Sequence, residues 1–280
     1  MKERAVKILD ILSANKNVKV TLLSEMLDVS HVTLRKDLDY LEKRGIIRRM
    51  HGYASLDGAD GEGKRMAINH SIKRRIAMAA AQIVEEGETI MIESGSCCAL
   101  LAEELAFSQK NVTIITNSIY IINYVRHLRG AKLILLGGNY LPDSHVLVGP
   151  MITKSAENLF PAKFFLSVDG FIPAFGFTGS DYLRAETAAK LAERVKDVFI
   201  LTDAAKFKRC GAYSLIRFNK LSGVFTDEGI PNEAETVLRK NNVRLHKAPS
   251  GERPFSQRSF FEQQLMRLNI SRGSPKAVLC

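Results

Sequence analysis

The chain has 280 residues, enough for a large core and an accessory domain, and its 46% hydrophobic and 25% charged residues are typical of soluble globular proteins. No apolar run reaches the roughly 18 residues of a membrane span, the N-terminal segment has no export signal, and the four cysteines fit neither a disulfide framework nor a metal site, so we expect a cytoplasmic protein without metal or cofactor. The net charge of +10 favours a polyanionic partner, although solubility alone accounts for it equally well.

Residues 1–56 show the pattern of three short helices followed by a hairpin. This end of the chain is basic, with 11 Lys and Arg against 7 Asp and Glu among residues 1–55. Thr21 is suited to cap the second helix, Ser30 to cap the third, and Gly45 to end it. This order of elements is typical of a winged helix-turn-helix. The expected elements are helices over residues 2–14, 21–27 and 31–44 and a hairpin over 46–56.

The third helix has the pattern of a helix that reads DNA. Leu34, Leu38 and Leu41 fall at i, i+4 and i+7 and form one buried stripe. The first turn of such a helix enters the major groove, where arginine binds guanine bidentately and threonine and lysine more often contact phosphates. A solvated basic face is the alternative, but the capped helix and the basic wing favour DNA. The candidate DNA-binding residues are His31, Thr33, Arg35 and Lys36 on the helix and Arg48, Arg49 and His51 on the wing.

A glycine-rich segment and a basic tail divide the rest of the chain. The small polar run DGADGEGK at 57–64 predicts a linker, after which a long helix is expected over 66–86. The last 31 residues are basic and contain two prolines, which predicts a partly disordered extension, with an engaged arm as the alternative. We expect a winged helix-turn-helix at 1–56, a linker at 57–65, an α/β domain at 66–249 and a tail at 250–280.

Beyond residue 86, short apolar runs alternate with helical stretches. Nearly continuous apolar strands that alternate with helices predict an open, largely parallel α/β sheet with helices on both faces. The expected strands are 89–94, 112–117, 131–138, 163–170, 197–203, 221–227 and 243–248. The expected helices are 96–107, 118–128, 150–159, 184–196 and 232–241.

Small polar residues follow three of these strands. The turn at 94–96 opens a helix whose free N–H groups, together with the serine hydroxyls, form an anion site. Ligands of open α/β sheets bind beyond the carboxyl ends of the strands, so we expect the three turns to converge on one cleft. Each turn could instead be an ordinary capped turn. The candidate ligand-binding residues are Ser94, Gly95, Ser96, Thr116, Asn117, Ser118, Gly137 and Gly138.

Residues 20–54, VTLLSEMLDVSHVTLRKDLDYLEKRGIIRRMHGYA, resemble the N-terminal domain of the DeoR family of bacterial transcriptional regulators. Lys36 stands where the family has a second arginine, and Tyr53 where it has a second glycine. The resemblance implies a regulator, most often a repressor, that binds double-stranded operator DNA as a homodimer or homotetramer. The matching positions are Val29-Ser30, the run from Thr33 to Leu38, Leu41-Glu42, Gly45 and the run from Arg48 to Gly52.

Residues 66–248 resemble the sensor domain of the same family, which is similar to the folds of ribose-5-phosphate isomerase and glucosamine-6-phosphate deaminase. The resemblance implies a phosphorylated sugar or related metabolite as effector, and it places Asp169 and Lys206 in the effector cleft. Glu186 joins them as a candidate, because carboxylates suit sugar hydroxyls and lysine suits a phosphate. Glu93 and Cys97-Cys98 depart from the aspartate and threonine that the family has in its phosphate turn.

Two alternatives to a ligand-controlled regulator remain open on sequence. Asp169, Glu186 and Lys206 could be acid–base groups of a phosphosugar isomerase or deaminase with an appended DNA-binding module. The adjacent Cys97 and Cys98 could sense oxidants if the start of their helix lowers their pKa. The complete DNA-binding pattern favours the regulator, so we do not expect an enzyme.

Overall fold

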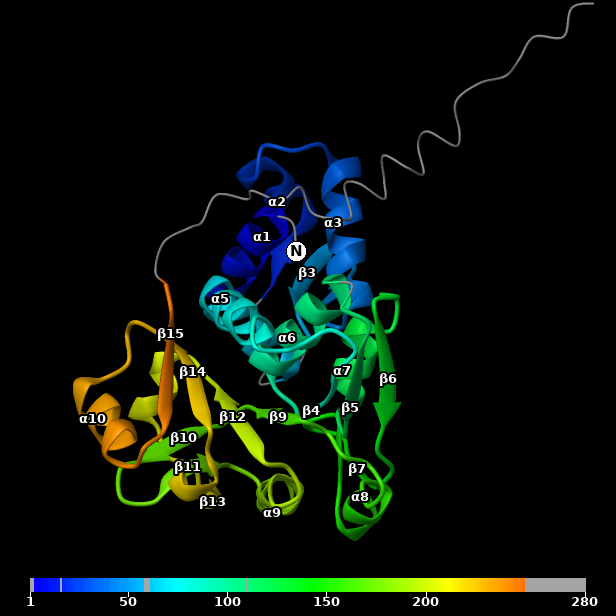
Figure 1. The fold of residues 1–280 in the computed structure, drawn as a ribbon. Helices are drawn as coiled ribbons and strands as arrows, with labels where there is room; N and C mark the ends of the chain where they lie inside the picture. The colour runs from blue at the N-terminus through cyan, green and yellow to red at the C-terminus, as the bar shows by residue number, and fades with distance from the viewer. Residues whose placement is uncertain (1–2, 16, 58–60, 109, 250–280) are drawn as a thin grey trace, which may run out of the picture. The chain divides into compact units, whose positions relative to one another are not determined.

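The computed structural model of the chain describes residues 3–15, 17–57, 61–108 and 110–249 (Figure 1). The expected tail at 250–280 and part of the expected linker, residues 58–60, lie outside the described residues. Within the described ranges, no helix is long and apolar enough to cross a membrane.

The N-terminal part of the chain is a winged helix-turn-helix, as its sequence pattern predicts. Helices α1 (Glu3–Ala14), α2 (Val20–Met26) and α3 (His31–Lys43) precede the wing strands β2 (Ile47–Met50) and β3 (Tyr53–Leu56). A short strand β1 (Val18–Lys19), which the sequence did not predict, pairs with β3 and gives the order β1-β3-β2. The predicted Thr21 cap is wrong, because α2 begins one residue earlier and its N-cap position, Lys19, makes no side-chain cap bond.

The predicted leucine stripe of α3 is confirmed as the centre of this part of the core. Leu34, Leu38 and Leu41 are completely buried and belong to the same hydrophobic cluster as residues of α1. The N-cap prediction for α3 is also correct, because the Ser30 hydroxyl accepts a hydrogen bond from the Thr33 N–H at 3.2 Å. The helix ends before Gly45, whose φ of +66° suits the left-handed conformation of a helix C-terminus.

The wing turns sharply at its tip. His51 and Gly52 separate β2 from β3, and both have a positive φ, 49° and 81°. A two-residue hairpin turn with both central φ angles positive matches the twist of the flanking strands. The His51 side chain therefore sits at the exposed tip of the wing.

The predicted long helix at 66–86 is two helices. Helix α4 (Glu62–Ala67) and helix α5 (His70–Ala81) are separated at Asn69, which adopts a left-handed φ of 55° and so breaks the helical path. Residues 62–65 of the expected linker thus belong to a helix. A Cβ on Gly63 would lie 2.4 Å from the Ile46 carbonyl oxygen, so only glycine allows α4 to approach the backbone before the wing this closely.

The remainder of the described chain is built on a seven-stranded sheet with the order β15-β14-β12-β9-β4-β5-β6, in which all neighbours are parallel. This confirms the predicted fold class. The strands are β4 (Thr89–Ile92), β5 (Val112–Thr116), β6 (Ala131–Leu135), β9 (Lys163–Leu166), β12 (Asp197–Leu201), β14 (Gly223–Asp227) and β15 (Arg244–Ala248).

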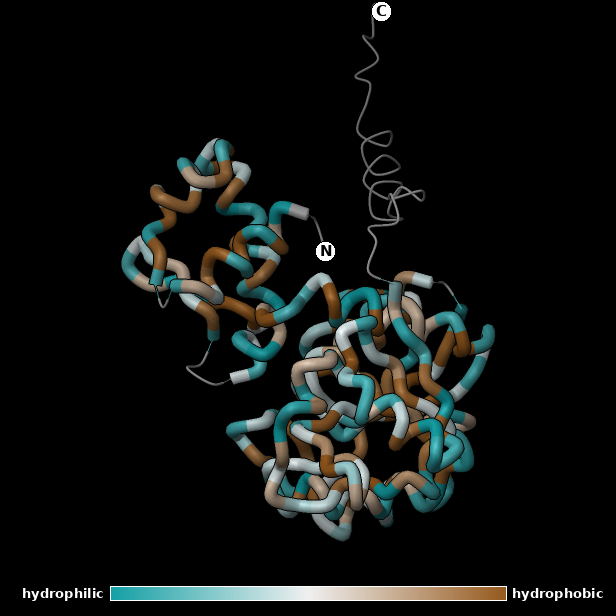
Figure 2. Tube along the Cα trace, turned by 90° about the vertical axis from the view of Figure 1, so that its left-hand side faces the viewer, coloured by the Kyte–Doolittle hydropathy of each residue, from teal (hydrophilic) through white to brown (hydrophobic). Residues whose placement is uncertain are grey.

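Helices cover both faces of the sheet (Figure 1). One face is covered by α5, α6 (Ser96–Phe107) and α7 (Ile119–Val125), and the other by α8 (Pro150–Ser155), α9 (Tyr182–Ala192) and α10 (Asn232–Lys240). Successive strand residues alternate between the two faces: Phe165 packs with the α5–α7 cluster, and Phe164 and Leu166 pack with the other. Burial on both faces is the reason that the strands read as continuous apolar runs, and Figure 2 shows the hydrophobic residues gathered inside the fold.

Several short elements, among them antiparallel strands and 3-10 turns, were not predicted. They are the hairpin β7 (Asn139–Leu141) and β8 (Val146–Val148), a sheet of β10 (Gly170–Ile172), β11 (Gly176–Gly179) and β13 (Tyr213–Ile216), and the 3-10 turns Ala204–Lys208 and Phe218–Lys220. Strands of three or four residues leave too little alternation for a sequence pattern to reveal them.

A buried histidine at the start of α5 makes the stability of the protein depend on pH. Burial lowers the pKa of His70 to about 4, and the bond between its Nδ1 and the Met66 carbonyl opposes this only partly. The unfolded chain, with an ordinary pKa near 6.5, binds more protons below that pH, so the free energy of unfolding falls as the pH falls from 6.5 to 4. Between pH 7 and pH 5 this histidine should account for about 2 kcal/mol of lost stability.

Urea unfolding of the full chain and of His70→Gln at the two pH values measures this contribution. Glutamine does not titrate in this range, so the variant should lose about 2 kcal/mol less than the wild type between pH 7 and pH 5. An equal loss in both proteins would mean that His70 is solvated.

Candidate functional site

The first turn of α3 presents exposed basic side chains. His31, Arg35 and Lys36 are exposed, whereas Thr33 is half-buried and its Oγ1 lies 3.0 Å from the Ser30 hydroxyl. Leu34 faces the core, and His31, Arg35 and Lys36 lie on the exposed surface of the turn. The turn therefore offers a guanidinium, an ammonium and an imidazole to a partner.

The two arginines of the wing differ in their surroundings. Arg48 is exposed, with one guanidinium nitrogen 3.2 Å from Asp57. Arg49 is held within the protein: its Nε donates to Glu42 at 2.9 Å, and its Nη2 pairs with Asp39 at 2.6 Å. Arg49 thus ties the wing to α3, in contrast to the expectation that its side chain is presented outward, while Arg48 and His51 remain exposed.

A pocket lies at the carboxyl ends of three neighbouring strands, β4, β9 and β12. Parallel strands end at the same edge of a sheet, so the turns that follow them meet there. Helices α4, α5 and α9 complete the walls. The lining residues are Glu62, Arg65, Lys73, Gly95, Ser96, Cys97, Ser167, Val168, Asp169, Arg184, Leu201, Thr202, Asp203 and Lys206.

The start of α6 forms one wall of this pocket. Its N-cap, Gly95, has a φ of 98°, and a Cβ there would lie 2.7 Å from the Ser167 side chain, so this position requires glycine. Because glycine has no side chain, no side-chain oxygen at the N-cap accepts a hydrogen bond from the N–H groups that begin α6. The first N–H groups of a helix have no partner inside the helix, and they carry the positive end of its dipole. The wall is therefore suited to an anion.

Four cations line the pocket, and three of them lie at a loose distance from a carboxylate. Lys73 Nζ lies 3.9 Å from Asp203, and Lys206 Nζ lies 3.8 Å from Asp169. These distances exceed a direct hydrogen bond, and Lys73 Nζ donates instead to the Arg65 carbonyl, so a ligand can approach either lysine without breaking a tight pair with a carboxylate. Burial lowers the pKa of Lys73, which reflects the cost of keeping its charge inside the protein.

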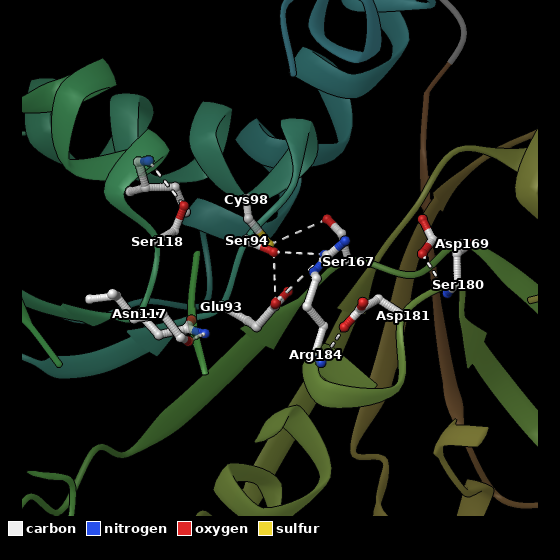
Figure 3. Close-up of polar contacts among 12 residues, drawn as sticks. Glu93, Ser94, Cys98, Asn117, Ser118, Ser167, Asp169, Ser180, Asp181 and Arg184 are labelled. Atoms are coloured by element: carbon white, nitrogen blue, oxygen red, sulfur yellow. Dashed lines mark hydrogen bonds and ion pairs between the residues drawn. The ribbon is translucent and has the colours of Figure 1, made fainter. Parts of the chain in front are cut away.

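The third cation, Arg184 of α9, takes part in a buried polar chain (Figure 3). Its Nη2 donates to the Ser94 hydroxyl at 2.9 Å, and that hydroxyl donates to Glu93 at 2.6 Å. Burial raises the pKa of Glu93, and the nearby Arg184 and Ser94 only partly offset this effect. Ser94 is thus engaged by protein groups behind the pocket wall.

Asp169 keeps its charge at the pocket edge. Burial alone would raise the pKa of its carboxyl, but the Ser180 N–H, which donates at 2.9 Å, together with Arg184 and Lys206, lowers it. Figure 3 shows Asp169 facing Ser180. An ionised carboxylate of this kind can accept hydrogen bonds from ligand hydroxyls.

The structure brings together only part of the predicted set. Gly95, Ser96, Asp169 and Lys206 line the pocket. Glu186 does not, because its carboxylate pairs with Lys190 at 2.9 Å on the outer side of α9.

The residues of the second and third turns do not line this pocket, although their strands β5 and β6 follow β4 in the sheet and end at the same edge. The Thr116 hydroxyl donates to the Glu93 carbonyl at 3.1 Å, the Asn117 amide to Leu147 at 2.9 Å, and the Ser118 hydroxyl caps α7. Gly137 and Gly138 pack against α8, and a Cβ on Gly138 would lie 2.8 Å from the Ile152 side chain.

Burial of the two adjacent cysteines argues against the alternative that they sense oxidants. Burial raises the pKa of Cys97 to about 12 and that of Cys98 well above its usual value. Lys73 lowers the pKa of Cys97 and the Ser167 hydroxyl lowers that of Cys98, but neither offsets the burial. Both groups therefore stay protonated at neutral pH, and a protonated thiol is much less reactive toward oxidants than a thiolate.

Lys73, Arg184 and Asp203 were not predicted as site residues. For Lys73 a signal existed: Lys73, Ile76 and Ala77 share one buried face of α5, so a lysine stands on an apolar stripe. Asp203 lies three residues before the predicted Lys206. Arg184 had no local signal, since its role depends on the packing of α9. Among the described residues, no group of three or more His, Cys, Asp or Glu could hold a metal ion.

Comparisons with known proteins cover both parts of the chain. Residues 4–58 match the family model of the DeoR-like helix-turn-helix domain, and residues 68–228 match that of the DeoR C terminal sensor domain. The chain is 28% identical over 249 residues to a putative aga operon transcriptional repressor of Escherichia coli O157:H7, which covers 87% of this chain and 92% of that protein.

Two further similarities are to a second regulator and to a solved structure. The chain is 28% identical over 231 residues to the L-fucose operon activator of Escherichia coli K12, covering 80% of this chain and 94% of that protein. Among solved structures, ribose 5-phosphate isomerase a from Methanocaldococcus jannaschii matches with a TM-score of 0.36 and 17% identity, over 50% of this chain and 55% of that one.

Proposed function

Because the chain belongs to the DeoR family of transcriptional regulators, we propose that it is a repressor that is released from its operator when a phosphorylated sugar occupies the pocket at the start of α6. The observation that carries this proposal is a cation-rich pocket, with an uncapped helix start, on the same chain as an exposed basic recognition helix. The protein would act in the cytoplasm, where its DNA is.

The chemistry of the pocket supports a phosphorylated polyol rather than a bare anion. The N–H groups of α6, with Lys73 and Lys206 on either side, suit a phosphate group. Asp169 and Asp203 suit the hydroxyls of a sugar, because ionised carboxylates accept hydrogen bonds. The relatives are named for the aga and L-fucose operons, which agrees with a sugar-derived effector.

The DNA half of the proposal rests on α3 and the wing. His31, Arg35 and Lys36 would enter the major groove, with Thr33 at its edge, while Arg48 and His51 would reach the flanking backbone. A homodimer or homotetramer would present two such helices to a symmetric operator. Light scattering of the protein with and without a DNA duplex tests the assembly.

The effector proposal is tested by thermal-shift screening of phosphorylated pentoses, hexoses and alditols. A ligand at 100 times its Kd should add about 2.7 kcal/mol to the free energy of unfolding. The same ligand should then release the protein from a duplex of its own upstream region in a gel shift. If no panel member stabilises the protein, or if stabilising ligands leave the DNA complex intact, the proposed control by phosphosugars is wrong.

The sign of regulation needs its own measurement, because one relative is named a repressor and another an activator. Expression of a reporter gene placed behind the upstream region should rise when the gene for this protein is deleted, if the protein represses.

An isomerase or deaminase is the second candidate function, but Glu186, one of its three expected acid–base groups, pairs with Lys190 instead. Turnover of any phosphosugar in the panel would support the enzyme.

A further inference from the structure

One wall of the pocket comes from the segment that follows the DNA-binding wing. Glu62 and Arg65 of α4 line the pocket together with residues of α5, α6 and α9. The Glu62 side chain is only 4% exposed, and Arg65 Nη2 donates to its Oε1 at 2.6 Å. A carboxylate from this segment is thus fixed in position inside the pocket wall.

The second oxygen of this carboxylate has no partner. Glu62 Oε2 is buried and accepts no hydrogen bond from any described residue. Most buried polar atoms in proteins have a partner, so an orphaned carboxylate oxygen at a pocket marks a place where a donor is missing. None of the described side chains supplies that donor, so a bound ligand can.

The charges around Glu62 indicate which part of a ligand would supply that donor. Its charge acts on Lys73 and Arg184, two of the pocket cations. A phosphate would bind those cations and the α6 N–H groups, whereas its charge would be repelled by the carboxylate. A neutral hydroxyl, in contrast, can donate to Oε2.

We propose that Glu62 is an effector-binding residue whose Oε2 accepts a hydrogen bond from a hydroxyl of the bound phosphosugar. The inference rests on the proposed function and adds to it the residue that recognises a hydroxyl of the sugar rather than the phosphate group. Glu62 then favours sugar monophosphates that carry free hydroxyl groups. It disfavours inorganic phosphate and ligands with a second anionic group at the end that faces Glu62.

The position of Glu62 also connects the ligand to the DNA-binding part of the chain. Helix α4 packs against α1 and against the wing strand β3. Gly63, the next residue, lies against the backbone of Ile46 and Asp57 without room for a side chain. A ligand bound to Glu62 therefore acts on a helix that cannot shift without moving its contacts on the winged helix-turn-helix.

The test compares full-length wild type with Glu62→Gln and with Glu235→Gln as a matched control. Glutamine keeps the size of the side chain and an oxygen for Arg65, but it puts an NH₂ group where Oε2 stands, and that group donates hydrogen bonds and cannot accept one. Glu235 is a carboxylate in a surface ion pair outside the pocket. Kd values are measured by calorimetry for inorganic phosphate and for each phosphosugar of the panel that stabilises the wild type.

Glu62→Gln should weaken the binding of hydroxylated phosphosugars about 10- to 100-fold, the effect of losing one hydrogen bond to a charged group. Its affinity for inorganic phosphate should stay equal or rise, and its melting temperature and DNA affinity without ligand should match the wild type. Glu235→Gln should change none of these.

The possible failures are distinguishable. If Glu62→Gln binds phosphosugars as tightly as the wild type, or loses phosphosugar and inorganic phosphate by the same factor, Glu62 does not read a hydroxyl, while the sensing proposal stands. If neither the panel nor inorganic phosphate binds the wild type, the sensing proposal itself is wrong and this inference falls with it.

Discussion

Replacing Arg44 by Met should lower the free energy of unfolding of the full chain by about 3–5 kcal/mol, the cost of leaving a buried charge without its partner. Arg44 directly follows the recognition helix α3, and its side chain is 2% exposed. Its guanidinium donates to Glu103 of α6, which is equally buried. Methionine fills similar space but leaves the Glu103 carboxylate unpaired.

The surroundings of the pair explain why both groups remain charged. Burial alone would lower the pKa of Arg44 and raise that of Glu103, but the attraction between them reverses both shifts. The rings of Tyr40 and Tyr124 lie 4.3 and 4.8 Å from the guanidinium carbon, and the Tyr124 hydroxyl donates to Glu103 at 3.3 Å. Cation–π contacts and hydrogen bonds thus replace water around the pair.

A double-mutant cycle separates the pair from its neighbours. Glu103→Leu alone should cost about as much as Arg44→Met, because either leaves one charge buried. The double variant should regain most of the loss, since apolar side chains of similar volume can replace a buried ion pair at little cost. Urea unfolding measures all four proteins, and a loss below about 1 kcal/mol for both single variants would mean that the pair is solvated.

The sequence was sufficient to predict elements whose side chains follow one repeating pattern. The range of α6, residues 96–107, is predicted to the residue, and all seven strands of the parallel sheet are predicted within a few residues. Both result from burial, because α6 is buried on nearly all sides and the strands are buried on both faces, so each reads as an almost continuous apolar run. The break at Asn69 escaped prediction, because one left-handed residue leaves the apolar pattern on either side unchanged.

The site could be predicted only where its residues lie close together in the chain. The turn at Gly95 and Ser96 is local, and it does line the pocket. Glu62, Lys73 and Arg184 come from three helices, and their meeting depends on the order of the strands, which periodicity does not specify. Arg44 reads in the sequence as one more basic residue after a helix, and its burial depends on a carboxylate 59 positions away.

Helix α6 joins the two functional regions of the chain. Its first turn is a wall of the pocket, and Glu103, two turns later, holds the residue that follows α3. The pocket wall and the partner of Arg44 therefore lie on one helix of 12 residues. The Arg44–Glu103 pair ties the C-terminal end of α3 to α6, while the first turn of α3 stays exposed.

Arg35→Ala should weaken binding to the upstream duplex about 10- to 100-fold and relax the preference at one base pair, because a bidentate arginine–guanine contact contributes about 1–3 kcal/mol of discrimination. Lys36→Ala should weaken binding to all sequences alike and lower the slope of log K against log salt by about one, as expected for one lost phosphate contact. Both side chains are exposed beside the buried Leu34, so neither change should reduce stability.

Fluorescence anisotropy with the upstream duplex, single-base variants of it and a scrambled duplex, at several salt concentrations, separates the two effects. Lys196→Ala, which removes an exposed lysine outside both sites, is the matched control and should bind as the wild type does. The wild type should lose affinity for the base variant that Arg35 reads, and Arg35→Ala should not. If the two variants show the same salt slope and the same base preference, the assignment of Arg35 to a base and Lys36 to a phosphate is wrong.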